Sequence, residues 1–359
     1  MTPETWTLVR EWFDEASALA GTRLAKFLDA LPNPEMRREV ETLLAAATNP
    51  DSILDTPALA GLPGAMAELC DDAAVEPASL VFESGDSIEQ YRIVRLLGQG
   101  GSGSVYQAVH TPDGMIVALK LLRASGDLDS EHSKRFQREA RMLTALRHPN
   151  IVSVLGVFDT AGRSVIAMEF VDGVPLGDLI QPGCGMPLDE VLRVARGVAE
   201  ALSVAHAAGI THRDLKPGNI LVTRQDGQAK LVDFGAAKQS RSTLGESVAG
   251  FTSTGNGLLI GSPAYMSPEQ AEGDPVDARS DIFSFGSLLY EMVSGVRVFE
   301  RRTMFASMSA VVREQAAPVA SIVPDIPERF AAVIHRCLRK DARLRFADGT
   351  ALLKALERL

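Results

Sequence analysis

The sequence predicts an α+β fold in which a small sheet-rich lobe precedes a large helical lobe, with a helical extension ahead of both. Three observations predict it. Residues 91–122 alternate between apolar and polar positions around glycines, which is typical of paired strands. Helical patterns dominate from Leu188 onward. Residues 1–48 also show helical spacing, and a stretch rich in proline and glycine separates them from the rest.

The first 48 residues are expected to form short amphipathic helices. Trp6, Val9 and Phe13 recur at helical spacing, and each later block again has one apolar stripe, so these helices must pack on one another or on another surface. Residues 49–87 contain four prolines without a clear period, which indicates a linker. The expected organisation is an extension over 1–48, a linker over 49–87 and a main domain over 88–359. Residues 1–87 bind a partner or support the domain, and both interpretations stay open.

The small lobe is expected to begin at Tyr91. Its strands alternate, and a turn at Pro112–Gly114 joins the second strand to the third. The elements expected in chain order are strands at Tyr91–Leu97, Val105–Val109 and Met115–Leu122, a helix at Ser133–Leu146, and strands at Val152–Phe158 and Ser164–Phe170.

Composition and charge exclude several classes of protein. The chain has 359 residues, of which 46% are apolar, enough for a sizeable core. A net charge of −10 argues against non-specific binding to nucleic acid or to an anionic membrane. The three cysteines are far apart and form no CxxC pair, which favours a reducing compartment. Neither a signal peptide nor an apolar stretch of about 20 residues is found, so we expect a cytoplasmic protein.

A glycine-rich segment runs from Gly98 to Val105. Glycines let backbone amides approach phosphates without obstruction by side chains. A dinucleotide-binding fold would need a helix after this segment and an acidic residue about 20 positions on. Here a strand follows, and that position holds Lys120. A phosphate-covering loop and an ordinary glycine-rich hairpin both remain open on this segment alone.

Lys120 ends an apolar strand that begins at Val117. A buried ammonium group is costly unless it is paired, and Glu139 on the following helix is the natural partner. Such a pair would direct Lys120 toward the α and β phosphates of a nucleotide. Taken singly, each residue is more often a solvated surface charge.

The segment Thr211–Asn219 carries the most specific pattern, together with Asp233–Gly235. Asp214 is suited to accept the proton of an attacking hydroxyl group. Lys216 can neutralise charge on a migrating phosphoryl group. Asn219 and Asp233 offer oxygen atoms of the kind that magnesium prefers.

From Tyr91 to Leu359 the chain resembles the bacterial branch of the eukaryotic-like, or Hanks-type, serine/threonine protein kinases. The resemblance implies the two-lobed kinase fold, protein substrates, and ATP with magnesium as cofactors, manganese being an alternative ion. It implies catalytic roles for Asp214, Lys216 and the pair Lys120–Glu139, and metal binding by Asn219 and Asp233. The nucleotide-binding residues that it implies are Gly98, Gln99, Gly100, Gly101, Ser102, Gly103, Val105, Ala118, Lys120, Met168, Glu169, Val171 and Leu221. Among them, Val105 and Ala118 would enclose the adenine and Met168 would be the gatekeeper of the hinge.

The resemblance extends through the large lobe. Ser267–Glu269 is similar to the family's APE motif with serine in place of alanine, and Glu269 is expected to pair with Arg345. Asp281 is expected to anchor the catalytic loop. Ala342 stands where proline is usual.

Lysine two residues after the base is the serine/threonine pattern, and Ser262 lies where a hydroxyl usually contacts the base. The segment between Gly235 and Gly261 contains many hydroxyl residues and belongs to the activation segment, a name used here for the chain from Asp233 to Glu269. Since Arg213 could pair with a phosphate, autophosphorylation is expected at Thr252 or Thr254. Two alternatives are a scaffold that binds nucleotide without catalysis and a kinase of small molecules. The substrate protein, the activating signal, the oligomeric state and any regulatory partner of the N-terminal helices do not follow from the sequence.

Overall fold

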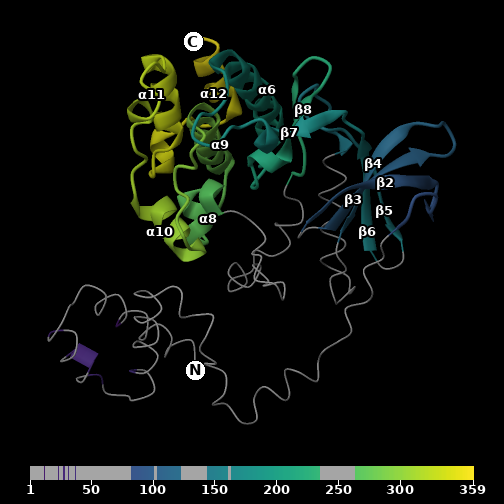
Figure 1. Cartoon of the computed structure of the whole chain (residues 1–359), viewed down its shortest axis with the longest axis horizontal. Helices are drawn as coiled ribbons and strands as arrows, with labels where there is room; N and C mark the ends of the chain where they lie inside the picture. Colours follow the sequence, from purple (N-terminus) through teal and green to yellow (C-terminus); the bar gives the residue numbers. More distant parts are fainter. Residues whose placement is uncertain are drawn as a thin grey trace. The chain divides into compact units, whose positions relative to one another are not determined.

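The computed structural model describes residues 82–100, 103–122, 144–160, 163–234 and 263–359, together with residues 12, 23, 27, 28, 31 and 37 (Figure 1). The chain divides into two compact units, Met1–Val81 and Phe82–Leu359, and the second carries everything that follows. The predicted N-terminal helices, residues 49–81 of the predicted linker and most of the helix predicted at Ser133–Leu146 lie outside the described residues.

The small lobe contains a six-stranded antiparallel sheet with the order β1-β2-β3-β4-β6-β5. The strands are β1 (Ser87–Ile88), β2 (Tyr91–Gly100), β3 (Gly103–His110), β4 (Ile116–Leu122), β5 (Val154–Thr160) and β6 (Arg163–Glu169). The five longer strands confirm the sequence prediction. The two residues of β1 are too few to show a period, so this strand was not predicted.

One face of this sheet forms the core of the small lobe. Tyr106, Leu119 and Ala167 lie opposite one another on β3, β4 and β6, and all three are buried. Phe82 packs edge-on against Tyr106 with ring centroids 6.0 Å apart. The opposite face carries Val105, Ala118 and Met168 by the same alternation. The register of the sheet therefore separates core residues from residues available to a ligand.

The large lobe is mainly helical and includes a second, three-stranded sheet with the order β7-β8-β9. Its strands are β7 (Gly173–Pro175), β8 (Ile220–Thr223) and β9 (Ala229–Leu231). Its α-helices are α6 (Leu188–Ala207), α8 (Pro268–Glu272), α9 (Ala278–Ser294), α10 (Met304–Arg313), α11 (Glu328–Cys337) and α12 (Gly349–Leu356). Short 3-10 turns lie at η2 (Leu176–Asp178), η3 (Pro217–Asn219), η4 (Pro263–Tyr265), η5 (Val319–Ser321) and η6 (Ala342–Leu344).

Helix α9 is the centre of the large lobe, because every residue from Ser280 to Ser294 is buried. The Asp277 side chain caps its first turn, and Gly295 ends it in the left-handed conformation. Phe283 of this helix stacks on Phe299 with ring centroids 5.6 Å apart. A helix buried on all sides gives the site residues above it a rigid support.

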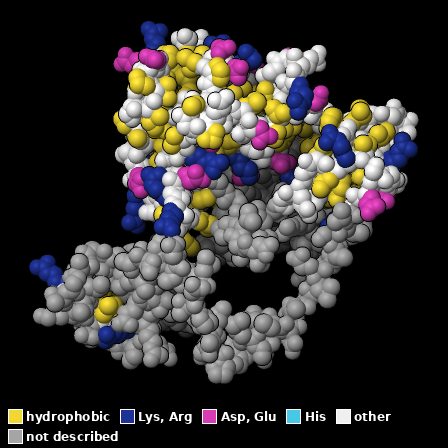
Figure 2. Space-filling view, viewed as in Figure 1, with side chains coloured by type: hydrophobic (Ala, Val, Ile, Leu, Met, Phe, Trp, Pro, Cys, Tyr) yellow, Lys and Arg dark blue, Asp and Glu magenta, His cyan; other side chains and the backbone are white. Residues whose placement is uncertain are grey.

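The two lobes meet along one strand. Asn150 and Val152, which precede β5, exchange backbone hydrogen bonds with Leu231 of β9 at 2.8 and 2.9 Å. These bonds also explain why β5 begins at Val154 and not at the predicted Val152. Within the described part of the chain, no helix is both long and apolar enough to cross a membrane. Figure 2 shows acidic and basic side chains interspersed among hydrophobic ones on the described surface in view.

Candidate active site

The candidate catalytic loop follows α6 and ends in η3. Lys216 Nζ donates to Asp214 Oδ2 at 2.8 Å. The amide Nδ2 of Asn219 donates to the same Oδ2 at 3.0 Å and to the Asp214 backbone oxygen at 2.8 Å. Two donors therefore fix the orientation of one carboxylate oxygen. The three residues that the sequence predicts to act together are thus in direct contact.

The backbone of this loop is held by Asp281 of α9, whose side chain is 1% exposed. Its two oxygens accept from the backbone nitrogens of His212 and Arg213 at 2.6 and 2.8 Å. Arg213 has a positive φ of 65°, which is strained for a residue with a side chain. The carboxylate of Asp281 offsets that strain, as the resemblance predicted for an anchor of the loop.

His206 of α6 supports Asp281 in turn. Its Nδ1 accepts from the backbone nitrogen of Gly349 at 2.9 Å, so its Nε2 carries the proton and donates to Asp281 Oδ2 at 3.0 Å. The first residue of α12 is thereby connected to the loop through two buried side chains. Sequence reasoning did not single out His206, because its partners lie far away in the chain.

His212 joins the loop to the strand that delivers Asp233. Its Nδ1 accepts from the backbone nitrogen of Asp214 at 3.2 Å, so Nε2 donates to the Val232 oxygen at 3.0 Å. Burial lowers the pKa of His212, against the opposing effect of nearby carboxylates, and keeps the ring neutral. Its ring also lies 4.8 Å from that of Phe234. The loop and Asp233 are therefore fixed relative to each other.

Lys120 projects from β4 across to Asp233. The two form an ion pair of 2.7 Å, and Lys120 as a whole is 7% exposed. Asp233 has a positive φ of 59°, which is uncommon for a residue with a side chain. The predicted partner Glu139 lies outside the described residues. Asp233 is the ion-pair partner of Lys120 in the described part of the chain.

Asn219 and Asp233 suit a hard divalent cation. The Nδ2 of Asn219 donates to Asp214, which leaves the Oδ1 of Asn219 as a ligand for a metal ion. Asn219 also lies beside the end of β9, because the backbone nitrogen of Val232 donates to its backbone oxygen at 2.9 Å. The carboxylate of Asp233 follows directly. One amide oxygen and one carboxylate form the donor set that magnesium accepts, together with phosphate oxygens and water.

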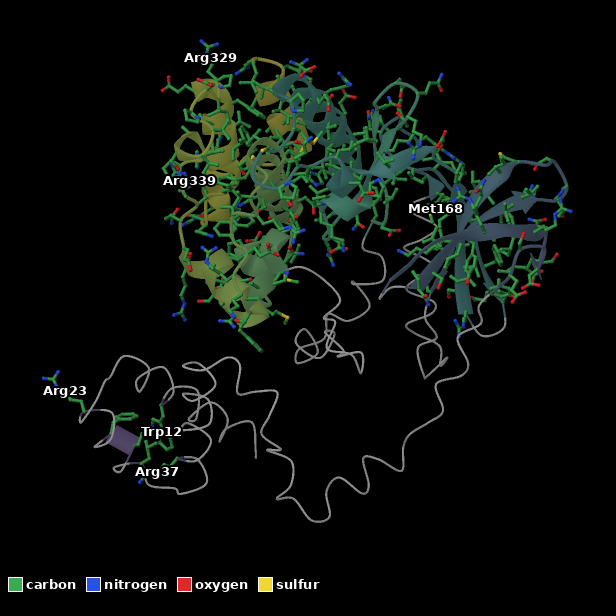
Figure 3. All side chains as sticks on the ribbon, in the orientation of Figure 1. Trp12, Arg23, Arg37, Met168, Arg329 and Arg339 are labelled. Carbon is green, nitrogen blue, oxygen red and sulfur yellow. The ribbon has the colours of Figure 1, made fainter. Side chains whose placement is uncertain are left out.

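The predicted adenine-binding residues form an apolar cluster between the lobes. Ala118 and Met168 are buried, and Val105 and Val171 pack against them. Figure 3 shows Met168, in β6, on the side of the small lobe that faces the large lobe. Two residues that the sequence analysis missed, Val152 and Val232, complete the cluster. Leu221 is not part of it and lies half-buried in β8, paired with Lys230.

Both missed valines had a weak signal in the sequence. Val232 immediately precedes Asp233, and Val152 begins the run that was predicted as a strand. Their role depends on how the lobes meet, which no local pattern shows. Lys230 was missed for the same reason, since it forms an ion pair of 2.6 Å with the predicted hinge residue Glu169.

The glycine-rich segment is a β2–β3 hairpin above this cluster, in which Gly98 lies opposite Val105. At Gly103 the fold itself requires glycine, since φ is 138° and a Cβ would lie 1.9 Å from the Leu121 oxygen. At Gly98 and Gly100, by contrast, no described atom lies within 4 Å of an added Cβ. The bare backbone at those two positions therefore leaves room for a ligand. Gln99 lies between them, whereas Gly101 and Ser102 are outside the described residues.

The end of the activation segment is fixed to the large lobe by the predicted ion pair. Arg345 binds both oxygens of Glu269, at 2.7 and 3.0 Å. Burial alone would raise the pKa of Glu269, but the hydrogen bonds from Arg345 and Ser280 outweigh it and lower that pKa. Ala342 in place of the usual proline is accommodated, because Asp341 caps the turn η6.

Three further contacts hold the same segment. Ser267 and Gln270 form a capping box at the start of α8. The Gln270 side chain then donates to the Arg213 oxygen at 2.8 Å, which joins α8 to the catalytic loop. Tyr265 donates to the buried Glu291, which also binds Arg297 at 3.0 Å. The surface next to Asp214 is therefore built on α9.

Comparison with known proteins agrees with this geometry. Residues 91–355 match the family described as protein kinase domain. Serine/threonine-protein kinase Pkn1 of Myxococcus xanthus is 36% identical over 270 residues, which cover 74% of this chain and 38% of that protein. A probable serine/threonine-protein kinase PknB of Lactococcus lactis is 35% identical over 261 residues, covering 72% of this chain and 40% of that protein.

The chain thus spans about two fifths of the length of these curated relatives. A crystal structure of a double mutant of the Mycobacterium tuberculosis PknI kinase domain superposes with a TM-score of 0.62 at 28% identity, covering 78% of this chain and 99% of that one. The fold, the matched motifs and these relatives together show that the chain belongs to the protein kinase family and is similar to bacterial serine/threonine members of it.

Proposed function

We propose that this chain transfers the γ-phosphoryl group of ATP to serine or threonine hydroxyl groups of proteins. The observation that carries the proposal is the contact of Asp214 with Lys216 and Asn219, at 2.8 and 3.0 Å, next to the Lys120–Asp233 pair. Phosphoryl transfer depends mainly on positioning and on stabilising charge. This arrangement supplies both positioning and charge stabilisation from side chains that already contact one another.

Each residue has a role in the proposed reaction. Asp214 orients the substrate hydroxyl and accepts its proton, while Lys216, already held at the same carboxylate, offsets charge on the transferred group. Lys120 binds the α and β phosphates once it leaves Asp233. Asn219 and Asp233 would hold magnesium or manganese, which would supply positive charge to offset that of the terminal phosphates.

The nucleotide would be bound between the apolar cluster and the glycine-rich hairpin. Val105, Ala118, Met168 and Val171 offer an apolar surface for the adenine. The backbone near Glu169 would hydrogen-bond its edge. The open space at Gly98 and Gly100 supports placing the phosphates beneath the hairpin. The other predicted residues, including Leu221, remain part of this proposal.

Transfer of radiolabelled phosphate from ATP to a generic protein substrate tests the proposal. Asp214→Asn should lower the rate at least about a hundredfold, or about 2.7 kcal/mol of transition-state stabilisation. Asp325→Asn, at an exposed carboxylate of the large lobe, is the matched control and should act as wild type. ATP affinity is measured alongside. Tight ATP binding without transfer in the wild-type chain would instead support the scaffold alternative.

We also propose that the activation segment is autophosphorylated at Thr252 or Thr254, which lie outside the described residues. Arg213 supports this, since its Nε is buried without a hydrogen-bond partner in the described part of the chain. A phosphate beside it would supply a charge-assisted acceptor. Mass mapping after incubation with ATP and magnesium should find phosphate within residues 240–254. Its absence from an active preparation would refute the proposal.

The remaining proposals concern context. ATP as donor and the free thiols of Cys184 and Cys337 support action in the cytoplasm, which cell fractionation would check. The N-terminal region serves either as a docking site for a regulatory partner or as a support of the domain. Deleting residues 1–81 separates these roles, because loss of a partner in a pull-down at unchanged melting temperature favours the first.

A further inference from the structure

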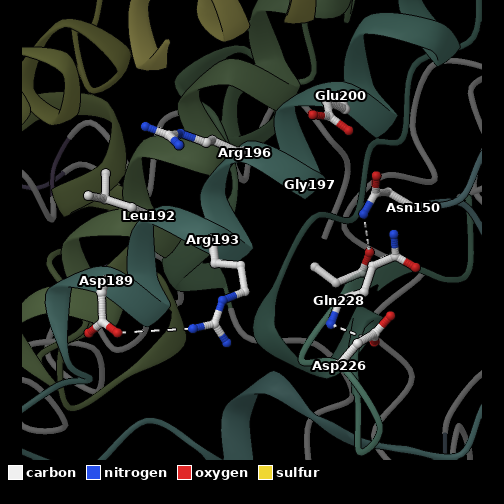
Figure 4. Close-up of a pocket in the computed structure, with 10 residues that line it drawn as sticks. Asn150, Asp189, Leu192, Arg193, Arg196, Gly197, Glu200, Asp226 and Gln228 are labelled. Atoms are coloured by element: carbon white, nitrogen blue, oxygen red, sulfur yellow. Dashed lines mark hydrogen bonds and ion pairs between the residues drawn. The ribbon is translucent and has the colours of Figure 1, made fainter. Parts of the chain in front are cut away.

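A cavity of about 630 Å³ lies away from the candidate active site, between helix α6 and the turn that joins β8 to β9 (Figure 4). One wall of the cavity is a face of α6 that carries Asp189, Arg193 and Glu200. The other wall is the turn between β8 and β9, which carries Asp226 and Gln228. No residue assigned above to nucleotide, metal or substrate lines it. It is therefore a separate candidate binding site.

The floor of the cavity carries an unusual acceptor. Asn150 is 4% exposed, and its Nδ2 donates to the Ala229 oxygen at 2.7 Å. That bond fixes the side chain, so that Oδ1 is directed away from Ala229. In the described part of the chain no donor reaches this Oδ1. The atom is open to solvent, because the buried side-chain atoms without a partner in that part are those of Arg213 and Ser287. A buried acceptor that opens into a cavity favours a ligand with a hydrogen-bond donor.

The charges around this acceptor add to the same preference. Figure 4 shows the Glu200 carboxylate above the Asn150 amide and Asp226 below it. Glu200 has no ion-pair partner in the described part of the chain, and the hydrogen bonds of Asp226 come from Thr223 and Gln228. Both carboxylates are therefore available to a cation.

The two arginines of the lining do not cancel this preference. Arg193 lies 4.0 Å from Asp189 and packs against Gly227, where an added Cβ would be 2.7 Å from its Nη1. It lines the cavity beside the carboxylate of Asp189. Figure 4 shows the guanidinium group of Arg196 directed away from Asn150. The polar groups of the lining nearest Asn150 are thus mainly acceptors.

We propose that this cavity is a binding site for a cationic group rich in N–H donors, namely the guanidinium or ammonium group of a basic side chain in a partner protein. A guanidinium group presents several donors in one plane, which suits a cavity that has the Asn150 amide at its floor and the exposed carboxylates of Glu200 and Asp226 in its lining. The net charge of −10 on the chain also favours the approach of basic partners.

The probe is a fluorescein-labelled, amidated peptide of alanine with two arginines and no hydroxyl residue, measured by fluorescence anisotropy against the full chain. Glu200→Gln should weaken binding about tenfold, which corresponds to about 1.4 kcal/mol. Asp226→Asn should weaken it in the same direction. Glu190→Gln, at an exposed carboxylate of the same helix outside the cavity, is the matched control and should bind as wild type.

A second arm distinguishes the source of the cation. Competition by spermidine would show that a free polyamine also occupies the site, whereas failure of spermidine to compete would restrict the site to a peptide. A peptide with glutamine in place of both arginines should not bind. Equal affinity of wild type and Glu200→Gln, or equal weakening by Glu190→Gln, would overturn the proposal.

Discussion

Replacing Arg345 by alanine tests how the large lobe holds the end of the activation segment. The Arg345 side chain is 0% exposed and binds Glu269 through two nitrogens. It also donates to the backbone oxygens of Arg339, Arg279 and Lys340 at 2.7, 2.9 and 2.9 Å. Truncation would leave a carboxylate and three carbonyl groups without this donor.

Breaking a buried ion pair by removing one partner costs about 3–5 kcal/mol. For a domain of this size, about 1 kcal/mol corresponds to roughly 2–4 °C in melting temperature. Arg345→Ala should therefore lower the melting temperature by roughly 6–20 °C. Arg345→Lys keeps the charge but loses the planar fork, so it should fall between wild type and alanine.

Urea unfolding followed by circular dichroism gives the free energy directly, provided that the slope with denaturant is unchanged. Arg343→Ala is the matched control. It removes the same charge two residues away, where the side chain is 82% exposed in its ion pair with Asp341. An exposed pair contributes about 0–1 kcal/mol. If Arg345→Ala and Arg343→Ala differed by less than about 1 kcal/mol, the reasoning about this bridge would be wrong.

Three other predictions concern separate parts of the domain. Burial lowers the pKa of Lys340 from 10.5 to about 8, so the unfolded chain binds this proton more tightly than the folded chain between these pH values. The free energy of unfolding of wild type, relative to that of Lys340→Arg, should therefore rise with pH from about 8 to 10.5. A difference that does not change with pH would contradict this. Ala118→Leu overfills the apolar cluster and should weaken ATP binding at least about tenfold by calorimetry, or 1.4 kcal/mol, whereas an unchanged Kd would exclude Ala118 from the nucleotide site. Gly103→Ala places a Cβ against the Leu121 oxygen and should cost at least about 1 kcal/mol more than Gly114→Ala, whose surroundings are open; equal costs by urea unfolding would refute that clash.

The strands and the catalytic loop were predictable because their signals are local. Alternation from Tyr91 onward fixes which side chains share a face of the sheet, and glycines mark the hairpin. Thr211–Asn219 carries its carboxylate, ammonium and amide groups within nine residues, so one loop already places them near one another. For Glu269 and Arg345 the distant pairing was predicted through the resemblance, and the structure confirms it.

What the sequence did not show depends on how distant elements meet. Val152 and Val232 lie on different lobes, and each looks like an ordinary strand residue in the sequence. They come together only because the segment before β5 hydrogen-bonds to Leu231 of β9. Asn150 reads as a loop residue, and its role at the floor of a cavity follows only from its bond to Ala229. Such contacts are set by packing, which periodicity along one element does not encode.

We propose that Asp214 and Lys216 act as one unit on the transferred phosphoryl group, and a double-mutant cycle on the rate of phosphate transfer measures the coupling between them. Single-turnover rates are compared for wild type, Asp214→Asn, Lys216→Met and the double variant. If the two residues act as one unit, the transfer rate of the double variant should be lowered about as much as that of the slower single variant. Losses that multiply in full would show that the two residues act independently, and would contradict it.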